Sequence, residues 1–368
     1  MIIDGSSLTY RAFYALPLLT DAAGRYTNAV YGLSTMLLRL LGEWQPQQLV
    51  VAFDKGKHTF RNEVYGDYKA HRKATPVELV EQFPLVRELA AAFGAAVLEQ
   101  EGYEADDIIG RVSRDAAQEG LDVLIVTGDR DALQLVEPAV KVLLTRKGIS
   151  EMDVYDEAKV QEVYGMEPLR LIDLKGLMGD ASDNIPGGPG IGEKTEAKLL
   201  AQFGTLEEVL AQAAQVKGNK TREALISNAD LALLSKKLAT IVRDMPLAED
   251  WRQSKPEAGA ALATFFTQMD FRSLLARLAL NGTETAAPAE QELAPLQWQE
   301  EQTALLWLAQ EQAVAVWPLW DGPCLSGLVL SKGSEVCWFA AECASWDTLL
   351  LELVAKKNAV GHDVKRLV

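Results

Sequence analysis

Three short apolar runs, each followed by an aspartate, constrain the fold of this chain more than any other feature of its sequence. The runs and their acids are residues 1–3 with Asp4, 49–53 with Asp54 and 123–126 with Asp129. Short runs rich in β-branched residues are typical of buried strands in a parallel sheet. Helical periodicity fills the segments between them, at 29–43, 76–93 and 105–119. We therefore predict an α/β fold with right-handed crossovers, in which the three aspartates meet where the strands end.

The composition is that of a folded protein that does not enter a membrane. The chain has 368 residues, of which 48% are apolar, and 36 basic and 52 acidic residues give a net charge of −16. Its three cysteines, Cys324, Cys337 and Cys343, have neither zinc-site nor disulfide-framework spacing. No apolar run is as long as a membrane span, and the N-terminus lacks the basic and then apolar pattern of a signal peptide, so we expect a cytoplasmic, bacterial and nucleoid-associated protein. The acidic balance argues against a simple basic clamp for nucleic acid, unless the acids gather in one site.

Composition also divides the chain. Helical patterns follow the α/β part at 168–179, 194–203, 206–214 and 221–242, and a polar stretch follows them. Six of the eight tryptophans lie after that stretch, which indicates a separate folding unit. We predict an α/β domain at 1–175, a helical subdomain at 176–280, a linker at 281–297 and a truncated domain at 298–368.

Nine acids occupy positions that the predicted sheet brings together: Asp4, Asp54, Glu104, Asp106, Asp107, Asp129, Asp131, Asp180 and Asp183. The spacing of Glu104 and Asp107 places both on one helical face, and Asp180 and Asp183 have the same spacing. Taken alone, acids at a helix start are also favoured by the helix dipole, and an Asp-Gly pair is a common turn. Taken together, clustered carboxylates repel one another unless cations neutralise them.

Oxygen ligands without nearby histidine or cysteine select hard cations, Mg²⁺ or Mn²⁺. Two such ions about 4 Å apart can activate water and stabilise the leaving oxygen of a phosphodiester. The competing motifs are missing from the sequence: no GxGxxG follows the first strand, and there is no GxxxxGK[ST]. We therefore expect a site for phosphoryl transfer with two or more metal ions.

Two further segments suggest contact with nucleic acid. Residues 55–73 carry six basic and two acidic residues, interleaved with Tyr65 and Tyr68, which suits a single strand but also suits a solvated loop. The glycine-rich turn at 186–195 could direct backbone N–H groups of Gly190, Ile191 and Gly192 at a phosphate, or could simply be a turn. Nearby Lys194 favours contact with a duplex backbone.

Several short motifs of this chain together resemble those of a known family. The segments Asp4-Gly-Ser-Ser, Phe53-Asp54, Tyr68-Lys69, Glu104-Ala-Asp-Asp107, Thr127-Gly-Asp-Arg-Asp131, Gly179-Asp-Ala-Ser-Asp-Asn-Ile-Pro186 and Gly190-Ile-Gly-Glu-Lys-Thr195 resemble the 5′-nuclease domains of bacterial DNA polymerases I, within the flap endonuclease family. The resemblance covers about residues 1–280. It implies a PIN-like parallel-sheet domain with a helix–hairpin–helix subdomain.

The resemblance also implies roles for individual residues. Metal ligands would be Asp4, Asp54, Glu104, Asp106 and Asp107 for one ion and Asp129, Asp131, Asp180 and Asp183 for another. Arg11, Lys69 and Arg72 would contact the cleaved phosphate, and Asp107 would belong to the same catalytic set. Tyr68 and Arg61 would contact DNA, as would Gly190, Ile191, Gly192 and Lys194, with a K⁺ ion at the hairpin. A helical arch at about 62–86 would admit a 5′ single strand.

The implied activity is 5′–3′ exonuclease and 5′-flap cleavage by a monomer, on nicked or flapped DNA and on hybrids with an RNA primer. The setting would be primer removal and repair, within a longer polymerase. Residues 298–368 resemble the start of a ribonuclease-H-like 3′–5′ exonuclease domain. They lack an Asp-x-Glu pair on the first strand, and Leu367 stands where an aspartate is expected, so we predict that this part is inactive.

Overall fold

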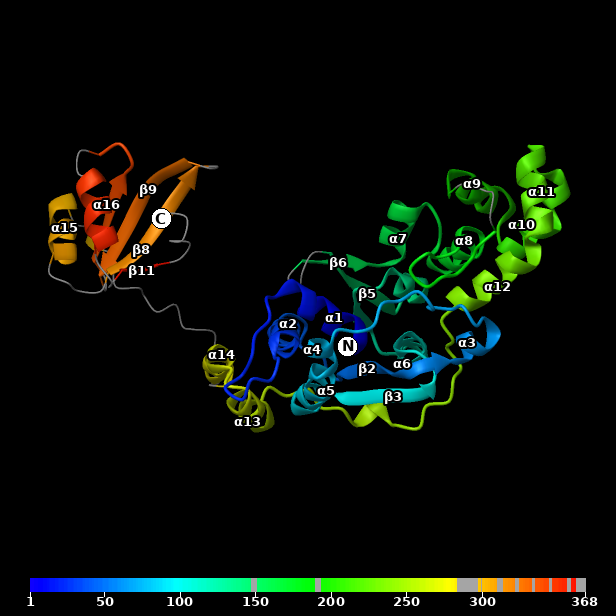
Figure 1. The fold of residues 1–368 in the computed structure, drawn as a ribbon, viewed down its shortest axis with the longest axis horizontal. Coiled ribbons are helices and arrows are strands. Elements are labelled where there is room, and N and C mark those ends of the chain that lie inside the picture. The colour runs from blue at the N-terminus through cyan, green and yellow to red at the C-terminus, as the bar shows by residue number, and fades with distance from the viewer. Residues whose placement is uncertain are drawn as a thin grey trace. The chain divides into compact units, whose positions relative to one another are not determined.

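The computed structural model describes residues 1–146, 151–188, 193–282, 297–298, 300–309, 314–321, 324–332, 335–343, 346–355 and 359–361. The chain divides into two compact units, Met1–Thr283 and Glu284–Val368; Figure 1 labels their helices and strands. No helix in the described ranges is both long enough and apolar enough to span a membrane.

The first unit is built on a six-stranded sheet with the strand order β3-β2-β1-β4-β5-β6. The strands are β1 (Ile2–Asp4), β2 (Val50–Thr59), β3 (Ala96–Gly102), β4 (Val123–Thr127), β5 (Val140–Thr145) and β6 (Met152–Tyr155). All neighbours are parallel except β5 and β6, which are antiparallel. The predicted α/β fold is confirmed, whereas the prediction of a purely parallel sheet is wrong at its β6 edge.

The register of β1 sets the geometry of the site. Ile2 and Ile3 pair with β2 on one side and with β4 on the other, so β1 lies at the centre of the sheet. Asp4 pairs with Ala52, two residues before Asp54. Because these strands are parallel, their carboxyl ends share one edge of the sheet.

Alternate residues of the central strands face two separate cores. Ile3 and Phe53 pack into one core, whereas Ile2 and Ala52 pack into the other. The first core is covered by α1 (Gly5–Ala15), α2 (Asn28–Trp44), α5 (Gln82–Ala92), α13 (Ala260–Gln268) and α14 (Arg272–Gly282). The second core is covered by α6 (Ala105–Gln118). This alternation is the period of two expected for strands buried on both faces.

Helices α13 and α14 correct the predicted extent of the helical subdomain. They follow it in sequence, but Phe266, Leu274 and Leu278 are buried in the first core, against residues of α2 and α5, and Figure 1 shows these helices beside one another. Residues 260–282 therefore complete the α/β part.

A small helical subdomain has its own core, which includes Leu177, Leu206 and Val209. Its helices are α8 (Leu171–Met178), α9 (Glu193–Phe203), α10 (Leu206–Ala211), α11 (Asn219–Ser227) and α12 (Ala229–Ala239). The prediction of one helix over 221–242 is wrong, because α11 ends at Ser227 and is capped by Asn228, whose side-chain amide donates to the carbonyl of Ala224 (2.9 Å). Helix α7 (Glu157–Tyr164) precedes this subdomain.

The segment expected to form a helical arch is mostly non-helical. It begins with α3 (Phe60–Val64) and continues as turns and extended chain to α4 (Val77–Val80) and α5. The single helix predicted over 76–93 is divided at Glu81. Pro84 explains the division, because proline lacks an N–H and is tolerated only in the first turn of a helix.

The second unit contains a mixed five-stranded sheet with the strand order β11-β8-β9-β10-β7. Its strands are β7 (Gln297–Trp298), β8 (Val314–Asp321), β9 (Cys324–Lys332), β10 (Glu335–Ala340) and β11 (Ala359–Gly361). Helices α15 (Glu301–Ala309) and α16 (Trp346–Ala355) contribute Trp307 and Leu349 to its core. The ribonuclease-H-like assignment of this unit stays a prediction.

Candidate active site

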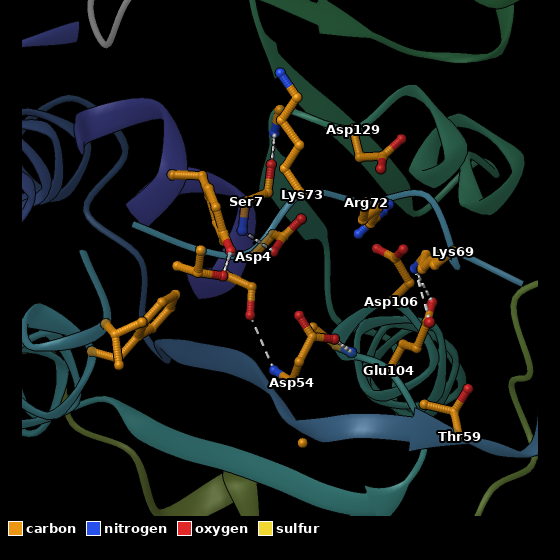
Figure 2. A pocket seen from close by; sticks show the side chains of 18 of the residues that line it. Asp4, Ser7, Asp54, Thr59, Lys69, Arg72, Lys73, Glu104, Asp106 and Asp129 are labelled. Carbon is orange, nitrogen blue, oxygen red and sulfur yellow. Dashed lines mark hydrogen bonds and ion pairs between the residues drawn. The ribbon is translucent and has the colours of Figure 1, made fainter. Parts of the chain in front are cut away.

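One pocket collects acids from four elements of the first unit. Asp4, Asp54 and Asp129 lie at or just beyond the carboxyl ends of β1, β2 and β4, and Glu104 and Asp106 lie at the start of α6. Figure 2 shows the five carboxylates around this opening. Asp131, Asp180 and Asp183, which were predicted in the same constellation, do not line this pocket.

Asp4 is held rigidly at the pocket floor. It caps α1 by accepting a hydrogen bond from the Ser7 N–H (2.9 Å), and its second oxygen accepts one from the Thr127 hydroxyl (2.6 Å). Burial, together with the charges of Asp54 and Asp129, outweighs these hydrogen bonds and raises the pKa of Asp4 to about 7.

The start of α6 brings three segments together. Glu104 is the N-cap residue, and Asp54 accepts a hydrogen bond from the Ala105 N–H (2.9 Å). Asp106 faces the pocket, and burial raises its pKa well above the usual value, helped by the charges of Asp129 and Asp4. The pair that shares the pocket is thus Glu104 and Asp106, not the Glu104 and Asp107 pair that the spacing predicted.

Asp107 is a structural residue. Its side chain is fully buried and accepts two hydrogen bonds from the Arg61 guanidinium (2.7 and 2.8 Å). The same carboxylate also accepts the N–H groups of Glu104 and Val242. Both oxygens are thus occupied by protein donors, and the assignment of Asp107 as a metal ligand and catalytic residue stays a prediction.

The Arg61 side chain also makes several hydrogen bonds within the protein. It is 2% exposed and, besides Asp107, donates to the carbonyls of Leu238 and Thr240 (2.9 Å each). The guanidinium therefore joins the base of the arch to α6 and to the end of α12. These contacts use four of its N–H groups within the protein, and its assignment as a DNA contact stays a prediction.

Basic residues of the arch pair with acids beside the pocket. Lys69 donates to both oxygens of Glu104 (2.8 Å) and lies 3.4 Å from Asp183, which also pairs with Arg72. Burial alone would lower the pKa of Lys69, but the charges of Glu104 and Asp183 raise it. The ammonium group therefore stays charged, and Figure 2 shows it directed at Glu104.

Tyr68 is buried rather than presented to a ligand. Its hydroxyl lies 3.2 Å from carboxylate oxygens of both Glu104 and Asp183. Burial, with these two charges, raises the pKa of Tyr68, so its phenol remains a hydrogen-bond donor. In this arrangement the Tyr68 hydroxyl donates to Glu104 and Asp183 from the segment that was expected to form the arch.

The loop after α8 has a tight geometry that places Asp180 and Asp183. The backbones of Asp180 and Ile185 exchange two hydrogen bonds of 2.8 Å. Gly179 precedes them with a φ of +75°, and a Cβ there would lie 2.7 Å from the Gly187 nitrogen, so only glycine fits.

Lys175 is the functional residue that sequence reasoning missed. Its ammonium group pairs with Asp131 and donates to Asp180 (2.6 Å). Burial, with the charge of Asp129, raises the pKa of Asp131 to about 7. Burial of Asp180 acts in the same direction, but Lys175 and Ser182 overcome it and lower the pKa of Asp180 to about 2. The only sequence signal was a lysine five residues before Asp180.

The remaining predicted residues have mixed outcomes. Arg11 lines the pocket and donates to the carbonyl of Gly128 (3.1 Å). Gly190, Ile191 and Gly192 lie outside the described residues, and Lys194 lies in α9 without a described side chain. Their proposed contact with DNA stays a prediction.

The donor set fits hard divalent cations in its chemistry. Asp4, Asp54, Asp106 and Asp129 form no salt bridge with a lysine or arginine of the described residues. Within the described ranges, however, no three acidic, histidine or cysteine side chains stand close enough together to hold one ion. The ammonium group of Lys69 pairs with Glu104 and Asp183, and that of Lys175 pairs with Asp131 and Asp180. These two lysines therefore compensate part of the negative charge of those four acids.

Family models decide the relationship of this chain to known proteins. A model described as the 5′-3′ exonuclease N-terminal resolvase-like domain matches residues 1–165, and one described as the 5′-3′ exonuclease C-terminal SAM fold matches residues 166–260. The chain belongs to the 5′-3′ exonuclease family. It is therefore a nuclease region, as the sequence predicted, and the two matched ranges together extend to residue 260.

The curated relatives are DNA polymerases I. The chain is 50% identical to that of Bacillus caldotenax over 290 residues, which is 78% of this chain and 33% of that protein. It is 44% identical to that of Bacillus subtilis over 297 residues, again 33% of that protein. The chain thus spans about a third of the length of these relatives, in their 5′-3′ exonuclease region.

Solved structures with this fold include bacteriophage enzymes. One is T5 5′-exonuclease with zinc ions bound (TM-score 0.56, 21% identity, 76% of this chain and 97% of that one). Another is the bacteriophage T5 flap endonuclease in a pseudo-enzyme-product complex with DNA and metal ions (TM-score 0.55, 20% identity, 76% and 96%). At these identities the likeness shows a shared fold.

Proposed function

We propose that the first unit is a structure-specific 5′-nuclease that uses two or more Mg²⁺ or Mn²⁺ ions to cut DNA beside a 5′ flap or nick. The observation that carries this proposal is the set of four carboxylates, Asp4, Asp54, Asp106 and Asp129, that line one pocket and form no salt bridge within the described part of the chain. The metal and DNA bound in the solved T5 relatives support it.

Two groups of acids in this chain would bind different metal ions. Asp4, Asp54, Asp106 and Asp129, with Glu104 beside them, would hold divalent ions at the sheet edge. Asp131, Asp180 and Asp183 would serve a neighbouring ion after their basic partners move. When bound, such ions supply an activated water and neutralise charge on the scissile phosphate.

The arch residues would bind the phosphate. Lys69 pairs with Glu104 and Arg72 with Asp183, and Arg11 lines the same pocket. A phosphodiester entering here would replace Glu104 and Asp183 as the anionic partner of Lys69 and Arg72. Cations aimed at the position where charge develops during cleavage stabilise the transition state.

Duplex DNA would be held away from this pocket by Gly190, Ile191, Gly192 and Lys194, with K⁺ at the hairpin. Tyr68 would meet unpaired nucleotides only after the arch opens, because its ring is buried in this arrangement. Duplexes with a DNA flap and hybrids with an RNA primer are the proposed substrates.

The biological setting we propose is primer removal and excision repair in the bacterial cytoplasm, by a monomer. Similarity to DNA polymerases I supports the alternative that this chain belongs to a longer enzyme whose activity also includes DNA synthesis. The second unit would then be an inactive relative of a 3′–5′ exonuclease domain, since β8 carries no Asp-x-Glu pair.

The test is cleavage of a 5′-flap duplex with Mg²⁺, compared with blunt duplex and single strand and repeated with a chelator. We expect cleavage next to the junction, abolished by the chelator, and a loss of roughly 10²-fold or more in Asp106→Asn. The matched control is Glu162→Gln, an exposed glutamate of α7 outside the pocket. Equal turnover by Asp106→Asn, or cleavage in the chelator, would contradict the proposal.

A further inference from the structure

Lys175 bridges two carboxylates that come from separate parts of the first unit. Asp131 lies in the short 3-10 helix after β4, and Asp180 lies in the tight loop after α8. One ammonium group pairs with both. The lysine is thus the direct link between the α/β part and the helical subdomain at this edge of the site.

The bridge lies in a partly buried place. The side chain of Lys175 is 25% exposed, and those of Asp131 and Asp180 are 16% and 17% exposed. Ion pairs that are this well shielded from water are screened less than surface pairs. The second oxygen of Asp180 is already occupied by the N–H and hydroxyl of Ser182 (2.8 and 2.6 Å), so the oxygen facing Asp131 is the one that Lys175 holds.

A single positive charge between two carboxylates leaves one negative charge uncompensated. A divalent ion at the same place would compensate both, but it cannot share the position with an ammonium group. Like charges at such short range repel, and the repulsion is larger where water is excluded.

We propose that Lys175 is a positioning residue that stands in for a divalent cation between Asp131 and Asp180, keeps the two carboxylates together before the ion binds, and competes with the ion for them. The inference rests on the metal-dependent function proposed above. It adds an exchange of cations to that function: the ion that binds must displace the lysine from its two acids.

A second lysine provides a matched control. Lys236 donates to Asp173 and to Glu207, with Nζ–O distances of 2.6 and 2.7 Å, and is 20% exposed. This bridge also joins a buried acid of α8 to another helix, but neither of its acids belongs to the proposed site. Neutralising Lys236 removes an equivalent bridge without removing a competitor for the ion.

The experiment is a titration of the full chain with Mn²⁺, without DNA, in which the free ion is measured by electron paramagnetic resonance. We expect Lys175→Met to bind the last ion at least tenfold more tightly than the unmodified protein, and to unfold at a lower temperature in chelator. Lys175→Arg keeps the charge and should restore the original affinity. Lys236→Met should lower the unfolding temperature and leave Mn²⁺ affinity unchanged.

Unchanged or weaker Mn²⁺ binding by Lys175→Met would overturn the inference, as would the same tightening in Lys236→Met. If the methionine variant does not fold, Lys175→Gln, which keeps a hydrogen-bond donor without the charge, answers the same question. Failure of the unmodified protein to bind Mn²⁺ at all is a different result, which overturns the proposed metal-dependent function and this inference with it.

Discussion

Replacing either member of the buried Arg61–Asp107 pair should cost stability without affecting metal binding. Arg61→Met leaves the fully buried Asp107 charge without a partner and leaves two main-chain carbonyls, of Leu238 and Thr240, without a donor. Breaking a buried pair in this way costs about 3–5 kcal/mol. Because single domains are stable by only about 5–15 kcal/mol, the loss is large enough to measure and small enough to leave folded protein.

Asp107→Asn should cost less, about 2 kcal/mol, because the amide can still accept one of the Arg61 hydrogen bonds. Replacing both residues, as Arg61→Met with Asp107→Leu, should cost less than the two single changes added together, since no charge is left unpaired. The assay is urea unfolding followed by circular dichroism in chelator, with Mn²⁺ binding measured on the same samples.

Asp106→Asn is the natural control, since the neighbouring residue faces the pocket and not the core. It removes a carboxylate whose pKa is raised by burial and by the charges around it, so it should not lower stability in chelator. It should weaken Mn²⁺ binding. If Asp107→Asn weakens Mn²⁺ binding while leaving stability intact, Asp107 is a ligand and our placement of it is refuted.

Three further predictions concern charge in the site. Because the folded-state pKa values of Asp4 and Asp131 are raised from 3.8 to about 7, the folded protein holds protons that the unfolded chain has released. The free energy of unfolding in chelator should therefore fall as the pH rises from about 4 to about 7, by on the order of 4 kcal/mol from Asp4 alone, and Mg²⁺ should reverse the fall in a thermal-unfolding series. Lys69→Ala should slow flap cleavage roughly 10²-fold in single-turnover kinetics and weaken duplex binding much less; the opposite order would remove this residue from the phosphate contact. Asp180→Asn should reduce cleavage by roughly the same factor while flap DNA is still bound in a gel-shift assay, and turnover equal to that of the unmodified protein would exclude Asp180 from the metal site.

The strand-end acids could be predicted from sequence because two simple rules act together. A short β-branched run before Asp4 and Asp54 fixes a buried strand, and parallel pairing brings the ends of neighbouring strands to one edge. Of the strands that were missed, β5 is apolar but is not followed by an aspartate, whereas β3 and β6 lack a long apolar run. Residues 96–102, which form β3, include two glutamates and a glutamine, and β6 has only four residues.

The different surroundings of Asp106, which lines the pocket, and Asp107, which is buried, could not be predicted from spacing. Both lie in the first turn of α6, where the helix dipole favours acids of either kind. What distinguishes them is a partner that is distant in sequence: Arg61 lies 46 residues before Asp107. Lys175 was missed for the same reason, because its link to Asp131 spans 44 residues and has no local pattern.

The return of α13 and α14 onto α2 and α5 determines when this unit can finish folding during synthesis. Phe93 and Val51 are made early, yet they share a core with Phe266 and Leu278 near the end of the unit. A nascent chain that has emerged only as far as α12 would still expose the apolar face of α2 and α5 that these helices cover. Completion of the nuclease fold must therefore wait until the ribosome has released nearly the whole of the first unit, and trimming the protein at residue 260 would leave the same face uncovered.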